Sequence, residues 1–241
     1  MLIKSRAIVL NSLKFGESQM IVDLLTETQG RLSFVQRVPR SARGRMRTRL
    51  FQPLTLLQVE IDFRPNRRLQ TLRDATIDVP FQSIPFDARK LAIALFVAEF
   101  TTYTTRREQA NTPLFDYIAN SVMWLDACTS DFANFHIIYM LRLSRFAGFY
   151  PNLESASNGA YFDLRSGCFS AQVPMHRDYI DPTEARKIGL LMRVSYATMH
   201  LIAMSREERN RCVEVIVHYY RLHEPDFPEL KSLPVLRELF V

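Results

Sequence analysis

Arginine is concentrated between residues 30 and 49, in the stretch GRLSFVQRVPRSARGRMRTR, which contains no acidic residue. Guanidinium groups stay charged at every accessible pH, and each can hold two phosphate oxygens or stack on a flat ring. The stretch therefore favours a site for a polyanion, with a solvated loop that serves solubility alone as the alternative. Its seven arginines are Arg31, Arg37, Arg40, Arg43, Arg45, Arg47 and Arg49.

The positive charge of the chain lies in its first third. The net charge is +6, but residues 1–80 hold 14 Lys and Arg against 7 Asp and Glu, whereas the remainder holds 17 against 18. This asymmetry predicts a basic module followed by a near-neutral one. Besides the arginine-rich stretch, the candidate phosphate-binding residues of the basic module are Lys4, Arg6, Arg64, Arg67 and Arg68.

The sequence offers little for catalysis. It has no phosphate-binding loop, dinucleotide fingerprint, nucleophile elbow or HExxH motif, and it contains 7 glycines in all. The five histidines are scattered, mostly on predicted helices beside aromatic residues, which is typical of structural histidines. We therefore expect no enzymatic activity. A metal-dependent nuclease built on Asp62, Asp74 and Asp78 is a weak alternative, because Asp62 belongs to the polar side of an amphipathic strand.

No metal or other cofactor is expected. A structural zinc site needs about four thiolate or imidazole ligands. The turn-rich stretch 149–179 offers Cys168, with His176 eight residues further on. The three cysteines are far apart, which suits reduced thiols. Because there is no long apolar stretch and the N-terminus carries charges, we expect a cytoplasmic protein without a membrane partner.

The first 80 residues have the pattern of short strands separated by turns. The clearest strand alternates Leu57, Val59, Ile61 and Phe63 with polar residues, as expected for a sheet with one buried face. Five such strands are the size of a small barrel of the oligonucleotide/oligosaccharide-binding (OB) fold. Their expected ranges are 5–13, 19–26, 31–38, 57–63 and 68–77.

The rest of the chain is expected to be helical, so that the fold class is α+β. Prolines near residue 80 mark the boundary between an OB domain, residues 1–80, and a helical domain, residues 81–241. Capping residues and apolar periodicity predict the helices. A hairpin is expected at 160–173, inside the turn-rich insertion 149–179. The expected helices are 88–105, 112–127, 132–147, one from Asp181 to about 202, and one from Ser205, the last two each with a reciprocal capping box.

Aromatic residues lie among the basic residues of the predicted barrel, namely Phe15, Phe34, Phe51 and Phe63. A basic groove with exposed rings is how barrels of this class hold single strands, because unstacked bases can stack on the rings. At least two of the four rings are expected in the core instead. The pattern favours nucleic-acid binding over the solubility alternative.

The order of these features resembles the bacterial recombination mediator family RecO. The resemblance rests on the opening SRAIVLNSLKFGESQMIVDLLTETQGRLSFVQRVPRS, on LFQPLTLLQVEI and on the closing LKSLPVLRELF. It implies an OB barrel joined to a helical domain and no catalysis. It also implies a nucleoid-associated protein that binds single- and double-stranded DNA, anneals complementary strands and helps to load RecA onto DNA coated with single-stranded-DNA-binding protein, together with RecR.

The resemblance places the DNA surface at Arg37–Arg49 and Arg64–Arg68, where we expect Arg40 to Arg49 to hold phosphates and Arg31 and Arg37 to form fixed edges of a groove. Many members carry a zinc module whose four ligand positions correspond to Ser155, Asn158, Ser170 and Val173, so a metal-free hairpin is expected here. An RNA-binding OB-fold adaptor is the alternative function, which a preference for RNA over DNA would indicate.

Overall fold

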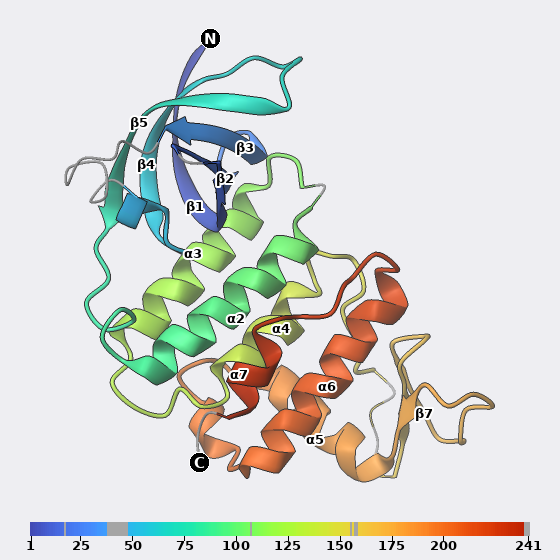
Figure 1. Ribbon diagram of the computed structural model, residues 1–241. Coiled ribbons are helices and arrows are strands. Elements are labelled where there is room, and N and C mark those ends of the chain that lie inside the picture. The colour runs from blue at the N-terminus through green and yellow to red at the C-terminus, as the bar shows by residue number, and fades with distance from the viewer. Residues whose placement is uncertain (17, 38–47, 107, 155, 157–158, 239–241) are drawn as a thin grey trace. The chain divides into compact units, whose positions relative to one another are not determined.

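Five strands at the N-terminal end of the chain close into a barrel (Figure 1). The computed structural model describes residues 1–241 except 17, 38–47, 107, 155, 157–158 and 239–241. It contains two units, Met1–Ala127 and Cys128–Val241, which are described in turn. The barrel strands are β1 (Leu2–Phe15), β2 (Gln19–Thr26), β3 (Gly30–Arg37), β4 (Leu56–Asp62) and β5 (Leu69–Val79). All five strands that the sequence predicts are confirmed, with ends that differ by a few residues.

The strand order around the barrel is β1-β2-β3-β5-β4. Neighbours are antiparallel except β3 and β5, whose parallel pairing is limited to Ser33 with Leu69 and Phe34 with Gln70. The last residues of β3 therefore have no ladder partner on β5. Alternate residues fill the interior, as the period of the sequence predicts. The core consists of Ala7, Val9, Met20, Val22, Leu24, Phe34, Phe51, Leu57, Val59, Ile61 and Leu72.

Two helices, α2 (Ala88–Thr104) and α3 (Thr112–Ala127), belong to the same unit as the barrel. Asp87 caps α2 through the amides of Arg89 and Lys90. The cap of α3 is Asn111, whose side chain accepts from the amide of Leu114 at 3.1 Å. Thr112 is the first residue of the helix.

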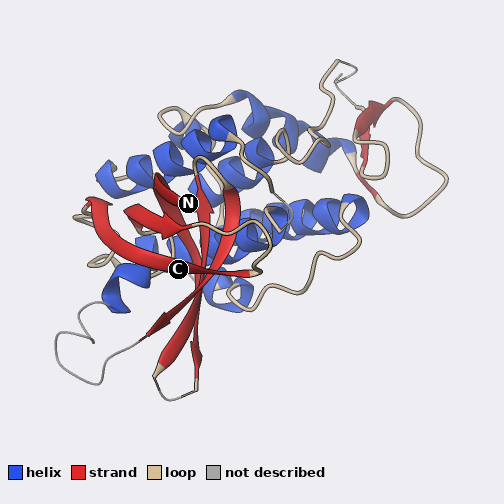
Figure 2. Cartoon of the chain, turned by 90° about the horizontal axis from the view of Figure 1, so that it is seen from above, coloured by secondary structure: helices blue, strands red, loops and turns tan. Residues whose placement is uncertain are grey.

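Helix α2 packs against β1, and the Thr102 hydroxyl donates to the Leu10 carbonyl at 3.2 Å. The contacts thus join α2 and α3 to the barrel, although the sequence places a boundary near residue 80. That boundary stays a prediction about which part of the chain folds independently. In Figure 2 the barrel strands are red and the helices are blue.

The second unit is mainly helical. The Tyr220 hydroxyl, inside α6, donates to the Met140 carbonyl of α4 at 2.8 Å. His136 is buried in α4, and its burial lowers the pKa of the imidazole to about 3, so the ring is neutral at pH 7. The helices are α4 (Phe135–Leu143), α5 (Pro182–Arg193), α6 (Arg206–His223) and α7 (Leu233–Arg237), with a 3₁₀ turn η2 (Met199–Leu201).

Helix lengths in this unit differ from the prediction in two places. Helix α4 is shorter than the predicted 132–147, and α5 ends at Arg193 rather than continuing to about 202. A turn follows α5, in which the Thr198 hydroxyl accepts from the amide of Ser195 at 2.9 Å. Apolar residues beyond the turn, such as Met199, are still buried, which explains why periodicity alone extended the helix.

Of the two predicted capping boxes, the one at α6 is confirmed and the one at α5 is not. Ser205 and Glu208 form a complete box at the start of α6. At α5, Asp181 caps the amides of Thr183 and Glu184, but the Glu184 carboxylate pairs with Arg211 at 2.6 Å instead of completing a box.

The predicted hairpin is confirmed as β6 (Tyr161–Asp163) and β7 (Cys168–Ser170), to which the two-residue strand β8 (Tyr179–Ile180) adds on the other side of β6. All three cysteines carry free thiols. Within the ranges that the structure describes, no helix is long and apolar enough to cross a membrane.

Candidate nucleic-acid interface

The arginine-rich stretch begins and ends on the barrel. Arg37 is the last residue of β3, and Arg49 is the first residue of the short helix η1 (Arg49–Phe51). Both side chains are exposed, and neither forms an ion pair with a described residue. The predicted phosphate ligands between them, Arg40, Arg43, Arg45 and Arg47, lie outside the described residues.

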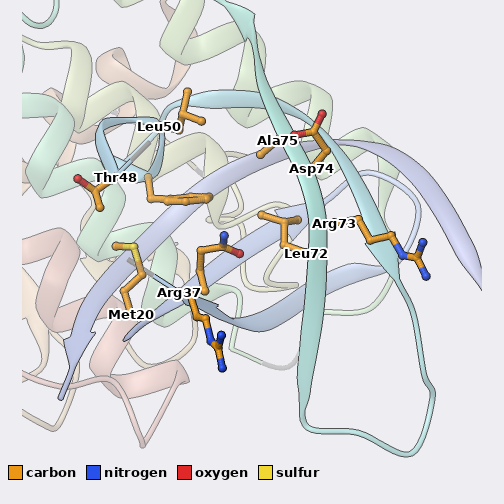
Figure 3. Close-up of a pocket in the computed structure, with 10 residues that line it drawn as sticks. Met20, Arg37, Thr48, Leu50, Leu72, Arg73, Asp74 and Ala75 are labelled. Atoms are coloured by element: carbon orange, nitrogen blue, oxygen red, sulfur yellow. The ribbon is translucent and has the colours of Figure 1, made fainter. Parts of the chain in front are cut away.

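A shallow hollow lies where β3 and β5 diverge (Figure 3). Leu72 lies between the Arg37 and Arg73 side chains, and Met20 lies on the other side of Arg37. Its volume of about 20 Å³ leaves room for about one water molecule, so the hollow does not enclose a base. It does bring the end of β3, the start of η1 and the middle of β5 together. The lining residues are Met20, Gln36, Arg37, Thr48, Leu50, Phe51, Leu72, Arg73, Asp74 and Ala75.

The basic turn between β4 and β5 is organised by one buried side chain, Gln70, which is 3% exposed. Its amide nitrogen donates to the carbonyls of Arg64 at 2.9 Å and Arg67 at 2.6 Å, and its amide oxygen accepts from the Arg64 amide at 2.8 Å. Gln70 thereby fixes the backbone of the turn while Arg67 and Arg68 remain exposed. Sequence reasoning missed Gln70, because a glutamine inside a strand gives no local signal of burial.

The cations of the turn differ in their partners. The Arg64 guanidinium lies 3.5 Å from the Asp62 carboxylate, and the Arg73 guanidinium lies 3.9 Å from the same carboxylate. Arg67 and Arg68 form no ion pair with the part of the chain that the structure describes. Arg73 was not predicted as a site residue. It is the extra residue of a bulge where the β4–β5 register shifts, which strand periodicity does not reveal.

Lys4 and Arg6, both predicted as phosphate ligands, are neutralised by acids of the barrel and of α3. Lys4 lies 2.7 Å from Glu60 on β4, and the hydrogen bond to Glu60 raises the pKa of Lys4. Arg6 lies 3.2 Å from Asp78 and 3.8 Å from Asp116, and its guanidinium lies over the ring of Phe115. This geometry favours a structural role for Arg6.

Arg31 is held in the same manner. Its guanidinium donates to the Asp23 carboxylate at 3.1 Å and to the Thr102 carbonyl at 2.5 Å, and its side chain is 15% exposed. These contacts tie β3 to β2 and α2. Arg31 is therefore a fixed residue, as the sequence suggested, although its charge is already compensated.

The acids of the nuclease alternative are also paired. Asp62 lies near the N-terminal amine, Arg64 and Arg73, and Asp78 lies near Arg6. Among the residues with described positions, no three His, Cys, Asp or Glu side chains are grouped so that they could hold a metal ion.

The four phenylalanines that the sequence places among the basic residues of the barrel differ in their exposure to solvent. Phe34 and Phe51 are buried in the barrel core, which confirms that at least two of the four rings are structural. Phe63 is half-buried against the same core. Phe15, at the end of β1, is 58% exposed and is the ring most accessible to a ligand.

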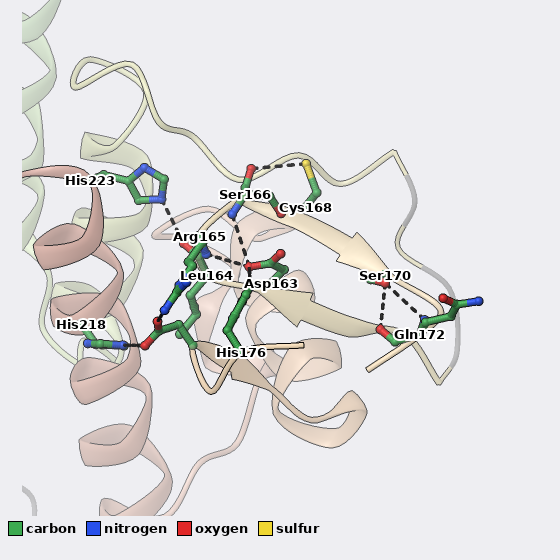
Figure 4. A network of polar contacts seen from close by, with 11 residues as sticks. Asp163, Leu164, Arg165, Ser166, Cys168, Ser170, Gln172, His176, His218 and His223 are labelled. Carbon is green, nitrogen blue, oxygen red and sulfur yellow. Dashed lines mark hydrogen bonds and ion pairs between the residues drawn. The ribbon is translucent and has the colours of Figure 1, made fainter. Parts of the chain in front are cut away.

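The β6–β7 hairpin is held by side-chain hydrogen bonds (Figure 4). Asp163 accepts from the amides of Arg165 and Ser166 and lies 3.3 Å from His176. Asp178 lies 2.9 Å from His218 of α6 and accepts from Arg165 at 2.7 Å. Hydrogen bonds with His218 and Arg165 lower the pKa of Asp178.

Two of the four positions that correspond to zinc ligands are described. The Ser170 hydroxyl donates to the Gln172 carbonyl at 2.8 Å, and Val173 is exposed. Ser155 and Asn158 lie outside the described residues. The Cys168 thiol donates to the Ser166 carbonyl at 3.4 Å. The expectation that the hairpin is metal-free stays a prediction.

The fold is therefore that of an α+β protein in which a closed five-stranded barrel of the OB type precedes a helical region. The family model described as "Recombination protein O N terminal" matches residues 1–81, and the one described as "Recombination protein O C terminal" matches residues 85–234. The chain belongs to the RecO family, as its resemblance indicated.

Curated relatives agree with this assignment. The chain is 50% identical over 241 residues to the DNA repair protein RecO of Bacteroides fragilis and 47% identical over 240 residues to that of Phocaeicola vulgatus. It is 32% identical over 244 residues to that of Christiangramia forsetii. Each comparison covers 100% of both chains. The family is one of DNA repair mediators and is not a catalytic family.

Proposed function

We propose that the barrel binds single- and double-stranded DNA, and that the protein anneals complementary strands. We further propose that, together with RecR, it helps to load RecA onto DNA coated with single-stranded-DNA-binding protein. The observation that carries the DNA-binding part is the division of the barrel's cations. Lys4, Arg6 and Arg31 face carboxylates, whereas Arg37, Arg49, Arg67 and Arg68 are exposed and form no ion pair with any described residue.

The physical reason is that a cation already paired with a carboxylate adds little to the attraction of a phosphate. An uncompensated arginine can instead replace the counterions of DNA, and the released counterions drive binding. Annealing follows from the same chemistry, because two strands that are each partly neutralised can approach one another. The function requires no catalytic group, which agrees with a family of mediators.

A strand-annealing assay tests the proposal, on naked complementary strands and on strands precoated with single-stranded-DNA-binding protein, with and without RecR. We expect the protein alone to accelerate the annealing of naked strands. With RecR present, we expect it to accelerate the annealing of coated strands as well. The variant R37A/R49A/R67A/R68A should anneal more slowly, whereas Lys4→Ala should anneal as the unchanged protein does.

Annealing by the unchanged protein at the protein-free rate would contradict the proposal. A marked preference for RNA over DNA of the same sequence would favour an RNA-binding adaptor instead.

A further inference from the structure

The outer surface of β1, β2 and β3 carries a row of apolar side chains. Leu13 pairs with Ile21, and Ile21 pairs with Val35, so the three side chains stand in line across the strands. Their neighbours along the strands, such as Met20 and Phe34, point into the barrel core. Because successive side chains of a strand point to opposite faces, the row points outward. In the next row, Phe15 pairs with Gln19, and Gln19 pairs with Arg37.

These six residues, which we call the β1–β3 face, are open to solvent. Leu13 is 61% and Phe15 is 58% exposed, and Ile21 and Val35 are partly exposed. The other end of the same three strands is covered by α2, through the contacts of Thr102 with Leu10 and Arg31. A row of large apolar side chains left uncovered on a sheet typically marks a binding surface.

The charge beside the β1–β3 face indicates what it binds. Arg37 belongs to the face and forms no ion pair within the described ranges. An apolar surface with an exposed ring and an adjacent cation of this kind is complementary to a chain of flat bases joined by phosphates.

We infer that the β1–β3 face holds unpaired bases of single-stranded DNA, with Phe15 as the stacking ring and Arg37 at an adjacent phosphate. The inference rests on the proposed DNA-binding function and adds strand selectivity to it. Bases in a duplex are already stacked on one another, so they cannot lie on Phe15. The Phe15 ring therefore contributes to the binding of single strands and not of duplexes.

Equilibrium binding of an oligothymidylate, and of a duplex of the same length, to Phe15→Ala tests the inference. Stacking of one base on an aromatic ring predicts that the affinity for the single strand falls about 5- to 150-fold. The affinity for the duplex should not change. Phe86→Ala is the matched control, because Phe86 is an exposed phenylalanine of the same unit, away from the β1–β3 face, and this variant should bind both DNAs normally.

An abasic oligomer with the same number of phosphates separates stacking from charge. Phe15→Ala and the unchanged protein should bind the abasic oligomer equally, because it has no base to stack. Phe15→Trp should restore the affinity for oligothymidylate, and its additional fluorescence should be quenched on binding.

Normal binding of oligothymidylate by Phe15→Ala would overturn the inference and leave the proposed function intact. Failure of the unchanged protein to bind any DNA would overturn the proposed function itself. A change in the sedimentation of Phe15→Ala without DNA would also overturn the inference, because it would assign the face to contacts between copies of the chain.

Discussion

At the scale of single residues, the arginines of the basic stretch have different roles. Arg31 is bound by Asp23 and the Thr102 carbonyl, whereas Arg37 and Arg49 are exposed. The sequence could locate the basic region, because charge composition is a local property. It could not identify the charge partner of Arg31, because Asp23 reaches it across the pairing of β2 with β3.

Gln70 provides a prediction at this scale. Gln70→Leu keeps the approximate shape of the side chain but removes three hydrogen bonds to the backbone of the β4–β5 turn. Backbone groups left without partners should lower the free energy of unfolding by about 1–3 kcal/mol, measured by urea denaturation. Gln58→Leu is the control, since exposed Gln58 bonds Asp78 at a position that water reaches. Equal stability of the two variants would show that Gln70 does not hold the turn.

At the scale of elements, the turn between β2 and β3 joins the barrel to the segment after α2. Gly30 has a φ of +68°, and the amide of Arg31 donates to the Glu108 carbonyl at 3.1 Å. A Cβ atom at position 30 would lie 2.4 Å from the carbonyl carbon of Gln109. Only glycine fits this contact without displacing backbone.

Gly30→Ala should therefore lower the free energy of unfolding by more than the cost of placing alanine in the left-handed conformation. Gly16→Ala is the matched control, because Gly16 has a φ of +64° and a Cβ atom added there would meet no atom within 4 Å. The left-handed conformation costs each alanine about 1–2 kcal/mol. We expect Gly30→Ala to lose about 1–3 kcal/mol beyond Gly16→Ala in urea denaturation, because overpacking adds to that cost. The same loss in both variants would contradict a tight contact at Gly30.

Strands were predicted better than helix ends. The alternation of Leu57, Val59 and Ile61 is imposed by a buried sheet face, so it can be read locally. The end of α5 at Arg193 could not be read locally, because the apolar pattern continues past the turn to Met199, which is buried. The short parallel pairing of β3 with β5, which forms the hollow of Figure 3, also depends on closure of the whole barrel.

At the scale of the whole molecule, the excess charge of the first 80 residues is spread unevenly over the barrel. On the outer side of the barrel the cations of β1 face acids of β4 and β5, as in the pairs Lys4–Glu60 and Arg6–Asp78. Arginines that form no ion pair with a described residue remain at the end of β3, at η1 and in the β4–β5 turn. The composition predicted the basic module. Which of its cations pair with acids depends on the strand register, which the composition does not reveal.

The salt dependence of DNA binding shows whether the exposed arginines, and not the paired cations, contact phosphates. The variant R37A/R49A loses two exposed charges. The variant K4A/R165A loses two charges that each lie 2.7 Å from a carboxylate, so it serves as the charge-matched control.

The measurement is the slope of log affinity for single-stranded DNA against log salt concentration. Each phosphate contact contributes about −0.7 to this slope. We expect R37A/R49A to make the slope less steep by up to about 1.4, for two lost contacts, and K4A/R165A to keep the slope of the unchanged protein. An unchanged slope in R37A/R49A, or an equal loss in K4A/R165A, would contradict this expectation.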